Sequence, residues 1–365
     1  MRIAILGGGH GCFAAAADLS EQGHEVRWWR RYAQGFEPIR VAGGVLLKDV
    51  TGQRRVPIGL MSAHIAEVLA GADLVVMPVP ANSHEDIARA MAPHLRSGQV
   101  VFLAPGTFGS FLIDKIVRQS GNDARVSYAE TGTLPYLART HGPDSVAITI
   151  RAVRLPTGVY PLRREAHAVQ VIQQAYPSVH ACGDALSGAL MNAGPIIHPP
   201  LILLNAAPLQ HFERWDIHHE GTTPAVRSVT SALDAERMAL REALGYGAPH
   251  YPLADHYNSD RWMYGDAHQR LTDSGDWRES IDLHTHRYMT EDVLLGLAFL
   301  ASVARKLGLN VPVTSGLLAI AGAIVGRPAL GQALDAGERS LESLGLAQMS
   351  IKEMQHVLRQ GSGFG

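Results

Sequence analysis

The chain has 365 residues, of which 46% are hydrophobic, and its 32 basic side chains nearly balance 34 acidic ones. This length and apolar content predict two domains with hydrophobic cores. The near-neutral and dispersed charge excludes a basic surface for nucleic acid or for an anionic membrane, so we expect small-molecule partners.

The cysteines and the start of the chain indicate the compartment. Cys12 and Cys182 are far apart in the sequence, which argues against a disulfide framework and fits a reducing environment. The first residues enter a strand pattern directly, with no room for a signal peptide, and no apolar run is long enough to span a bilayer. We therefore expect a cytoplasmic protein.

A glycine-rich turn follows the first predicted strand. Residues 2–6 are apolar, the turn leads into an alanine-rich helix, and a second strand follows at residues 24–29. In this βαβ context the glycines predict dinucleotide binding, because they allow a tight turn and leave the backbone open to a pyrophosphate at the helix N-terminus. A cysteine stands at the third fingerprint position, where a small residue still permits close packing. The predicted cofactor contacts are Gly7, Gly9, His10, Gly11 and Cys12.

The end of the second strand indicates which dinucleotide is bound. NAD-specific folds usually place Asp or Glu there to bond the ribose 2′-hydroxyl, whereas this chain has Arg30 and Arg31. Two guanidinium groups suit a 2′-phosphate. The sequence favours NADP, and NAD stays an alternative because an arginine pair can also be a solvated strand end.

Strands and helices alternate through the first half of the chain. Further strands are predicted at residues 73–77, 99–103, 125–129, 145–150 and 178–182, with a hairpin of strands 44–47 and 54–58 inserted before them. The pattern predicts an α/β domain over residues 1–186 with a Rossmann-type, doubly wound parallel sheet, which the strands at 125–129 and 145–150 extend. Ligands bind at the carboxyl ends of such strands, so we expect Val79, Pro80 and Thr131 to contact the cofactor.

From residue 187 the pattern changes to long helical segments. Helices are predicted near residues 193–209, 223–244, 290–307, 316–324 and 329–344. They indicate an all-α C-terminal domain over residues 187–365, built as a helical bundle. The apolar helices at 316–325 and 329–344 suit either the core or a homodimer interface.

Two segments of the second half carry candidate catalytic groups. His198 lies on an apolar face between prolines, and Thr290 is predicted to cap a helix whose first turn contains Asp292. Four features of the chain together resemble the octopine/nopaline (opine) dehydrogenase family, in the same order and over nearly the whole chain. They are the glycine fingerprint, Glu130-Thr131 with Leu134-Pro135-Tyr136, His198-Pro199, and residues 287–293.

The resemblance implies that a keto acid condenses with the amino group of an amino acid or another amine, and that NAD(P)H reduces the imine. It implies a catalytic pair at His198 and Asp292. Reduction consumes a proton, a histidine titrates near neutral pH, and a carboxylate on its other ring nitrogen fixes the tautomer. Asn192, Tyr136 and Arg287 are expected to bind substrate, with the arginine clamping a carboxylate.

Other functions are compatible with the same sequence. A related dehydrogenase that reduces a ketone to an alcohol would use a lysine as its acid, for which Lys306 is the candidate. A nucleotide-sensing protein would have kept the fold without the reaction. The histidine pairs at 218–219 and 284–286 lack a Cys or acid at a recognised spacing, so no metal is expected. The sequence does not name the keto acid or the amine, which residues 213–220 and 246–276 are expected to select.

Overall fold

The computed structural model describes residues 1–274, 280–332 and 339–361. The chain divides into two compact units, Met1–Ala189 with His356–Gly365, and Leu190–Gln355. The sequence predicted a division after residue 186, with all later residues in the second domain. In the structure the first unit ends at Ala189 and also includes the residues from His356 onward.

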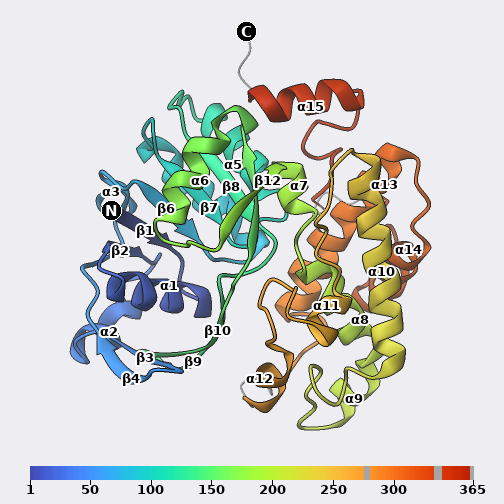
Figure 1. The fold of residues 1–365 in the computed structure, drawn as a ribbon, viewed down its shortest axis with the longest axis horizontal. Coiled ribbons are helices and arrows are strands. Elements are labelled where there is room, and N and C mark those ends of the chain that lie inside the picture. Colours follow the sequence, from blue (N-terminus) through green and yellow to red (C-terminus); the bar gives the residue numbers. More distant parts are fainter. Residues whose placement is uncertain (275–279, 333–338, 362–365) are drawn as a thin grey trace. The chain divides into compact units, whose positions relative to one another are not determined.

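The first unit is built on an eight-stranded sheet (Figure 1). Its strands are β1 (Arg2–Leu6), β2 (Glu25–Trp29), β5 (Leu60–Ser62), β6 (Leu74–Met77), β7 (Val100–Leu103), β8 (Ser127–Thr131), β11 (Leu155–Tyr160) and β12 (Val179–Asp184). They lie in the order β12-β11-β8-β7-β6-β1-β2-β5. Neighbours are parallel except β8 and β11, which pair antiparallel. The strand order reverses at β1, which confirms the predicted doubly wound sheet.

Helices cover this sheet, and its central strands are apolar along their whole length. Every residue of β6 and β7 is buried, as expected for parallel strands with both faces covered. The α-helices of the unit are α1 (His10–Glu21), α2 (Glu37–Val41), α3 (Ile65–Leu69), α4 (His84–Met91), α5 (Gly109–Gln119), α6 (Glu165–Gln173) and α7 (Ala185–Ala189). Short 3₁₀ helices occupy Ala33–Phe36, Ala81–Ser83, Ala92–His94 and Leu162–Arg164.

A second, four-stranded sheet packs against α1. Its strands are β3 (Val45–Asp49), β4 (Gly52–Val56), β9 (Tyr136–Gly142) and β10 (Ser145–Arg151), in the order β4-β3-β10-β9. The antiparallel pair β3–β4 is the predicted hairpin. The prediction that residues 145–150 extend the main sheet is wrong, because β10 pairs with β3 and β9. The alternation of apolar and polar residues identifies a strand, but it does not show which other strand pairs with it.

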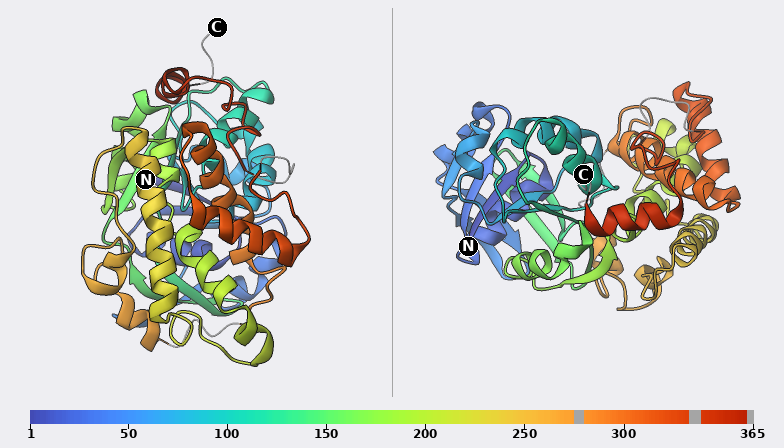
Figure 2. Two further views of the ribbon diagram at one scale, coloured as in Figure 1. Left: turned by 90° about the vertical axis from the view of Figure 1, so that its right-hand side faces the viewer. Right: turned by 90° about the horizontal axis from the view of Figure 1, so that it is seen from above.

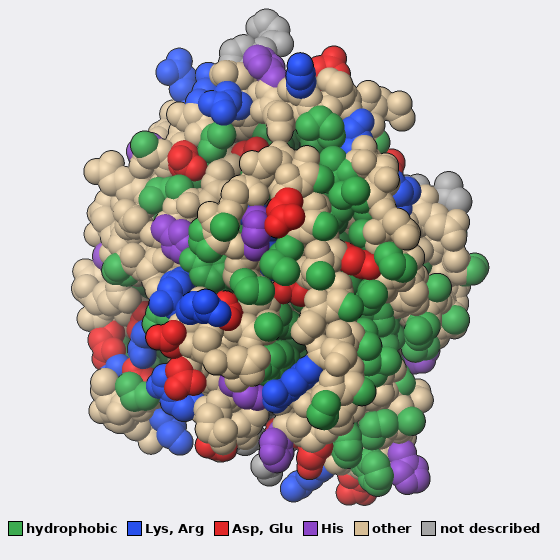
Figure 3. Space-filling view, turned by 45° about the vertical axis from the view of Figure 1, so that its right-hand side comes forward, with side chains coloured by type: hydrophobic (Ala, Val, Ile, Leu, Met, Phe, Trp, Pro, Cys, Tyr) green, Lys and Arg blue, Asp and Glu red, His purple; other side chains and the backbone are tan. Residues whose placement is uncertain are grey.

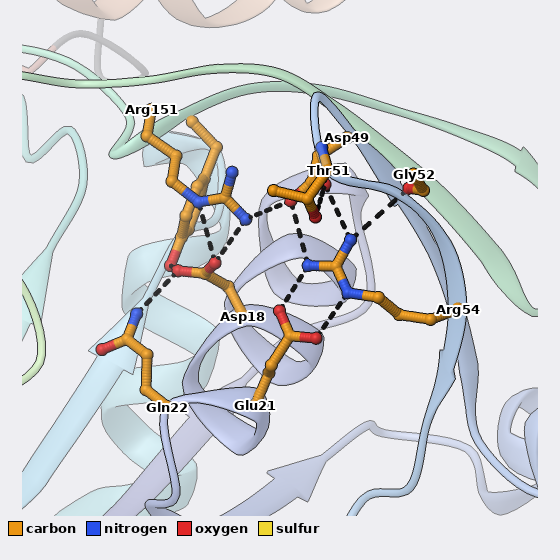
Figure 4. Close-up of polar contacts among 9 residues, drawn as sticks. Asp18, Glu21, Gln22, Asp49, Thr51, Gly52, Arg54 and Arg151 are labelled. Atoms are coloured by element: carbon orange, nitrogen blue, oxygen red, sulfur yellow. Dashed lines mark hydrogen bonds and ion pairs between the residues drawn. The ribbon is translucent and has the colours of Figure 1, made fainter.

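Ion pairs fasten α1 to the second sheet (Figure 4). Asp18 on α1 binds Arg151 on β10 at 2.7 Å, and Glu21 on α1 binds Arg54 on β4. Asp49 contacts both arginines at 2.7 Å, and its side chain is 1% exposed. The guanidinium of Arg54 holds the pKa of Asp49 well below its usual range. The network therefore fixes the helix that follows the glycine turn.

The second unit is helical, as predicted (Figures 1 and 2). Its helices are α8 (Gly194–Leu204), α9 (Ala206–His211), α10 (Pro224–Ala243), α11 (Ala254–Asn258), α12 (His268–Asp273), the π-helix η5 (Tyr288–Leu297), α13 (Ala298–Leu307) and α14 (Pro312–Val325). Residues of α15 (Ile351–Gln360) belong to both units, because the division falls after Gln355. The long helix α10 packs against α8, α13 and α14. A helix predicted at 329–344 is not found where the structure describes that segment, since residues 329–332 and 341–344 form turns, and 333–338 lie outside the described residues.

Two surface properties follow from the composition. On the face drawn in Figure 3, basic and acidic side chains are interspersed. Of the helices in the described parts of the chain, none combines the length and the apolar character needed to cross a membrane.

Candidate cofactor and catalytic sites

The glycine turn between β1 and α1 has the geometry that a dinucleotide requires. Gly7 has a φ of +124°, and a Cβ there would clash with Val79 and lie 2.9 Å from Sγ of Cys12. A Cβ on Gly9, by contrast, would meet nothing within 4 Å, and Gly9 immediately precedes the first residue of α1. Open space therefore lies beside the start of the helix, where a pyrophosphate binds backbone N–H groups.

The other predicted residues of the turn hold α1 in place. A Cβ on Gly11 would lie 3.0 Å from Cβ of Pro78, so the glycine permits close packing. Cys12 is fully buried, and burial raises the pKa of its thiol to about 12. It fills the third fingerprint position as a small neutral residue. Nδ1 of His10 accepts a hydrogen bond from the backbone N–H of Thr140 at 3.1 Å, which ties the helix start to β9.

The predicted contacts at the strand ends separate into two groups. Val79, which follows β6, packs over Gly7, and Pro80 beside it is half-buried. Thr131 is fully buried, and its hydroxyl donates to the carbonyl of Pro156 at 2.9 Å. The antiparallel strand β11, which the sequence analysis did not identify, covers Thr131. The structure therefore makes Thr131 a core residue instead of a cofactor contact.

Arg30 and Arg31 have different environments. A Cβ on Gly8 would lie 2.9 Å from Nε of Arg30, and Nη1 of Arg30 donates to the carbonyl of Gly35 at 2.5 Å. Three aromatic rings surround its guanidinium at 5.5, 5.6 and 5.7 Å. Arg31 is exposed and pairs with Asp86 at 2.9 Å. Of the two, Arg30 is the arginine that lies against the glycine turn.

A buried carboxylate shapes the loop after β7. Thr107 and Phe108 have φ values of +49° and +59°, a region that is costly for residues other than glycine. Glu130 on β8 is fully buried and accepts hydrogen bonds from the N–H groups of Phe108, at 2.7 Å, and Ser110, at 3.3 Å. Glu130 was expected only as part of the motif that it forms with Thr131. The sequence signal for Glu130 is a single acid in an otherwise apolar strand. Such an acid is expected to be buried, and a buried acid needs hydrogen-bond partners.

The second unit brings His198 and Asp292 together. Nδ1 of His198 on α8 lies 2.6 Å from Oδ2 of Asp292 on η5. Both side chains are largely buried, with 14% and 6% exposed. Burial raises the pKa of Asp292 to about 7, against the opposing charge of Arg287. Burial therefore favours a proton on this carboxyl, and the 2.6 Å contact allows the proton to be shared with His198.

Glycines allow α8 and η5 to approach closely. A Cβ on Gly194 would clash with Oδ1 of Asp292, and one on Gly296 would clash with Pro195. The helix that carries Asp292 is a π-helix, a form found frequently at functional sites. It begins at Tyr288, so the predicted cap at Thr290 is wrong.

The three predicted substrate residues do not share one environment. Asn192 is buried and accepts a hydrogen bond from the N–H of Gly194 at 3.0 Å, near His198 and Asp292. Arg287 is 38% exposed and lies 3.3 Å from Glu291. Tyr136 belongs to the first unit, is 2% exposed, and donates to Asp18 at 3.0 Å. The structure thus places Tyr136 in the core under α1 instead of on a ligand surface, because Tyr136 begins β9 and this strand packs against α1.

Tyr288, an aromatic residue that was not expected at the site, stacks on His198. The rings of Tyr288 and His198 have centroids 3.7 Å apart. Nε2 of His218 lies 3.5 Å from the hydroxyl of Tyr288, and the ring centroids of His286 and Tyr288 are 4.5 Å apart.

Within the described ranges, no group of three or more His, Cys, Asp or Glu side chains is arranged to hold a metal.

Lys306, the acid of the ketone-reducing alternative, has a structural partner. Its Nζ donates to the carbonyl of Ala347 at 2.9 Å. This contact joins α13 to the segment before α15. The hydrogen bond gives Lys306 a structural role, and this role requires no catalytic function.

Two family models match the chain. Residues 181–325 match the alpha-helical domain of NAD/NADP octopine/nopaline dehydrogenase. Residues 2–114 match the N-terminus of NAD-dependent glycerol-3-phosphate dehydrogenase.

Similar proteins extend over nearly the whole chain. An opine dehydrogenase of Arthrobacter sp. (strain 1C) is 27% identical over 355 residues, which are 95% of this chain and 96% of that protein. A structure of octopine dehydrogenase in complex with NADH and agmatine has a TM-score of 0.73 at 19% identity and covers 100% of this chain and 99% of its own. NADP+-bound yersinopine dehydrogenase has a TM-score of 0.66 at 16% identity, with 99% and 98% covered. These structures have the same fold.

Proposed function

We propose that this protein, which belongs to the octopine/nopaline dehydrogenase family, joins an α-keto acid to the amino group of an amino acid or another amine in an NAD(P)H-dependent reduction. It is an NAD(P)-dependent oxidoreductase acting on CH–NH bonds. The observation that carries the proposal is the 2.6 Å contact between His198 and Asp292.

The reaction needs an acid at the site of reduction. Condensation of the keto carbon with the amine nitrogen releases water and leaves a C=N bond, which is reduced by adding one hydride and one proton. NAD(P)H supplies the hydride when bound at the glycine turn. We assign the proton to Nε2 of His198, because Nδ1 is held by Asp292. The carboxylate fixes the tautomer and stabilises the imidazolium that would otherwise be costly to bury.

Neighbouring residues suit the substrates of this reaction. Arg287 lies one helical turn before Asp292, and we assign it to the carboxylate of the keto acid, which a guanidinium binds in bidentate fashion. Its contact with Glu291 is long, at 3.3 Å, so the guanidinium can also engage an anion. Asn192 supports the start of α8 beside the pair and is assigned to a hydrogen bond with substrate.

We further propose that NADP is the preferred cofactor. Residues 30–36, which directly follow β2, include no acidic side chain, and the guanidinium of Arg30 lies against Gly8 of the fingerprint. A guanidinium there suits a 2′-phosphate, whereas a 2′-hydroxyl is usually bound by an Asp or Glu that accepts its hydrogen bond. Arg31, paired with Asp86, is assigned a lesser share of this contact.

Substrate dependence tests the proposed reaction. NADPH oxidation should require a keto acid and an amine donor together, with each alone giving only background. Oxidation with the keto acid alone would favour ketone reduction. Tight NADPH binding without turnover, across a panel of keto acids and amines, would favour a nucleotide-sensing protein.

A further inference from the structure

A second polar cluster lies beyond the catalytic pair in the helical unit. It consists of Arg227 in the first turn of α10, His256 and Tyr257 on α11, and His268 on α12, and we call it the Arg227 cluster. Its three α11 and α12 residues come from segment 246–276, which the sequence analysis expects to select substrates.

Arg227 carries a positive charge, and no carboxylate in the described ranges pairs with it. Across residues 1–274, 280–332 and 339–361, it forms no ion pair. Its guanidinium lies 4.5 Å from the ring of Tyr257, and Nη2 lies 3.4 Å from Nε2 of His268. The charged groups that act on His256 and His268 are basic side chains. A half-buried guanidinium without a counter-charge is costly, so the site suits an anion.

Hydrogen bonding in the cluster is also incomplete. Nε of Arg227, Nδ1 of His256 and Nδ1 of His268 are buried, and none has a hydrogen-bond partner within the described part of the chain. Burial lowers the pKa of both histidines, that of His256 to about 3, so both rings are neutral at pH 7. An arginine can only donate, so Nε2 of His268 accepts and its Nδ1 carries the hydrogen. Arg227 and His268 therefore each hold an N–H donor without an acceptor, and buried donors are normally satisfied.

His218 connects the cluster to the catalytic pair. Its ring centroid lies 6.3 Å from that of His198, and its Nε2 lies 3.5 Å from the hydroxyl of Tyr288. The charge of His218 also contributes to the lowered pKa of His256. The Arg227 cluster and the group assigned to proton transfer thus share His218 as a neighbour.

We propose that Arg227 and His268 bind a carboxylate of the amine donor, and that the cluster disfavours donors with a basic side chain. The inference rests on the proposed function. Condensation of a keto acid with an amino acid gives a product with two carboxylates. Arg287 is assigned to the one from the keto acid, and Arg227 supplies the cation for the one from the donor.

A donor panel tests the proposal and identifies the carboxylate. With NADPH and a fixed keto acid, turnover is measured for glutamate, glutamine, 4-aminobutyrate and arginine. Arg227→Gln should lower kcat/KM about 10- to 100-fold for donors whose carboxylate is bound, the range expected for one charge-assisted contact, and should leave the KM of the keto acid unchanged. Equal losses of kcat/KM with glutamate and glutamine would identify the α-carboxylate, because both donors have it. Losses of kcat/KM with glutamate and 4-aminobutyrate, but not with glutamine, would identify the side-chain carboxylate.

Matched variants separate charge from position. Arg227→Lys keeps the charge without the planar fork and should lose less than Arg227→Gln. Arg261→Gln removes an arginine that is 74% exposed and paired with Asp255 on α11, and should change nothing. Equal kcat/KM in wild type and Arg227→Gln for every donor would overturn the proposal, as would a wild-type preference for arginine.

Binding of glutarate, a dicarboxylate without an amine, tests the site apart from catalysis. Glutarate should raise the Tm of the wild type but not that of Arg227→Gln or His268→Gln, with NADPH binding as the check that each variant is folded. If no donor is turned over but this Arg227-dependent stabilisation is found, the proposed reaction fails and the anion site stands. If donors are turned over and neither turnover nor stabilisation depends on Arg227, the site is wrong.

Discussion

The glycine turn and the pair of His198 with Asp292 are assembled in opposite ways. The turn is one short segment, residues 7–12, whose backbone leaves open space beside the start of α1. The pair joins two side chains that are 94 positions apart, across the contact of α8 with a π-helix. A backbone site depends on a few missing side chains, whereas a side-chain site depends on the packing of the elements that carry it. Substitutions at the two sites should therefore impair the protein in different ways.

The largest effect is expected at Gly9. Gly9→Val should abolish NADPH binding while the protein stays folded, because the added branches meet no protein atom near Cβ and occupy the volume of the pyrophosphate. Fluorescence titration with NADPH and circular dichroism measure the two properties. Gly247→Val, at another glycine whose Cβ would meet nothing within 4 Å, is the control and should bind NADPH normally. Unchanged affinity in Gly9→Val would show that the pyrophosphate does not bind here.

A substitution of Gly194 should disturb the pair of His198 with Asp292 through packing. In Gly194→Ala the new Cβ would displace Oδ1 of Asp292, and a displacement of about 1 Å can cost roughly 100-fold in kcat. NADPH affinity should be unchanged, because the change lies in the other unit. Gly316→Ala on α14, where a Cβ meets nothing within 4 Å, should have normal kcat. A Gly194→Ala variant with wild-type kcat would mean that the contact between His198 and Asp292 is not needed for turnover.

Cofactor preference should separate the two arginines after β2. Arg30→Ala should weaken NADPH about 10- to 100-fold and NADH little, because a charge-assisted contact to the 2′-phosphate exists in only one cofactor. Arg31→Ala should cost at most about fivefold, since its guanidinium is exposed and paired with Asp86. Dissociation constants for both cofactors provide the measurement. Equal losses for NADPH and NADH in Arg30→Ala would remove the basis for preferring NADP.

The smallest effect concerns the network under α1. Arg54 lowers the pKa of Glu21 and of Asp49 below their values in the unfolded chain, so its stabilisation is present at neutral pH and is lost as pH falls below about 4. Arg54→Ala should lower the free energy of unfolding by about 1 kcal/mol at pH 7, with a shrinking difference in acid. Urea unfolding at several pH values measures this.

An exposed pair is the control for that network. Arg89 and Glu85 form an ion pair with side chains 64% and 56% exposed, so Arg89→Ala should have almost no effect. A difference between wild type and Arg54→Ala that stays constant from neutral to acid pH would contradict the assigned role of the carboxylates.

The same contrast explains what the sequence could predict. The strand, turn and helix at the start of the chain follow from local pattern, and the first strand and the helix lie where they were expected. Thr131 and Tyr136 were assigned to ligands because two strands have no clear local pattern: β11, which pairs with Thr131, and β9, which begins at Tyr136 and packs against α1. Strand pairing is non-local, which also explains the wrong sheet for β10.

The helical unit was predictable in outline only. Helical periodicity indicated the segments of α10 and α14, but it cannot distinguish a π-helix from an α-helix or show that a glycine accommodates a carboxylate. The resemblance to a family indicated His198 and Asp292, whereas the 2.6 Å contact between them required the fold. The Arg227 cluster had no sequence signal, because its members become neighbours only when α10, α11 and α12 pack.

The pH dependence of kcat in the reductive direction tests most directly whether His198 is the acid. In the wild type, kcat should fall as pH rises above neutral, because the pair loses the proton that it must donate, and burial raises the pKa of Asp292 to about 7. His198→Ala should lower kcat roughly 10²–10⁴-fold, retain NADPH affinity and lack this alkaline limb. Near-normal turnover in His198→Ala, with the limb intact, would contradict the account.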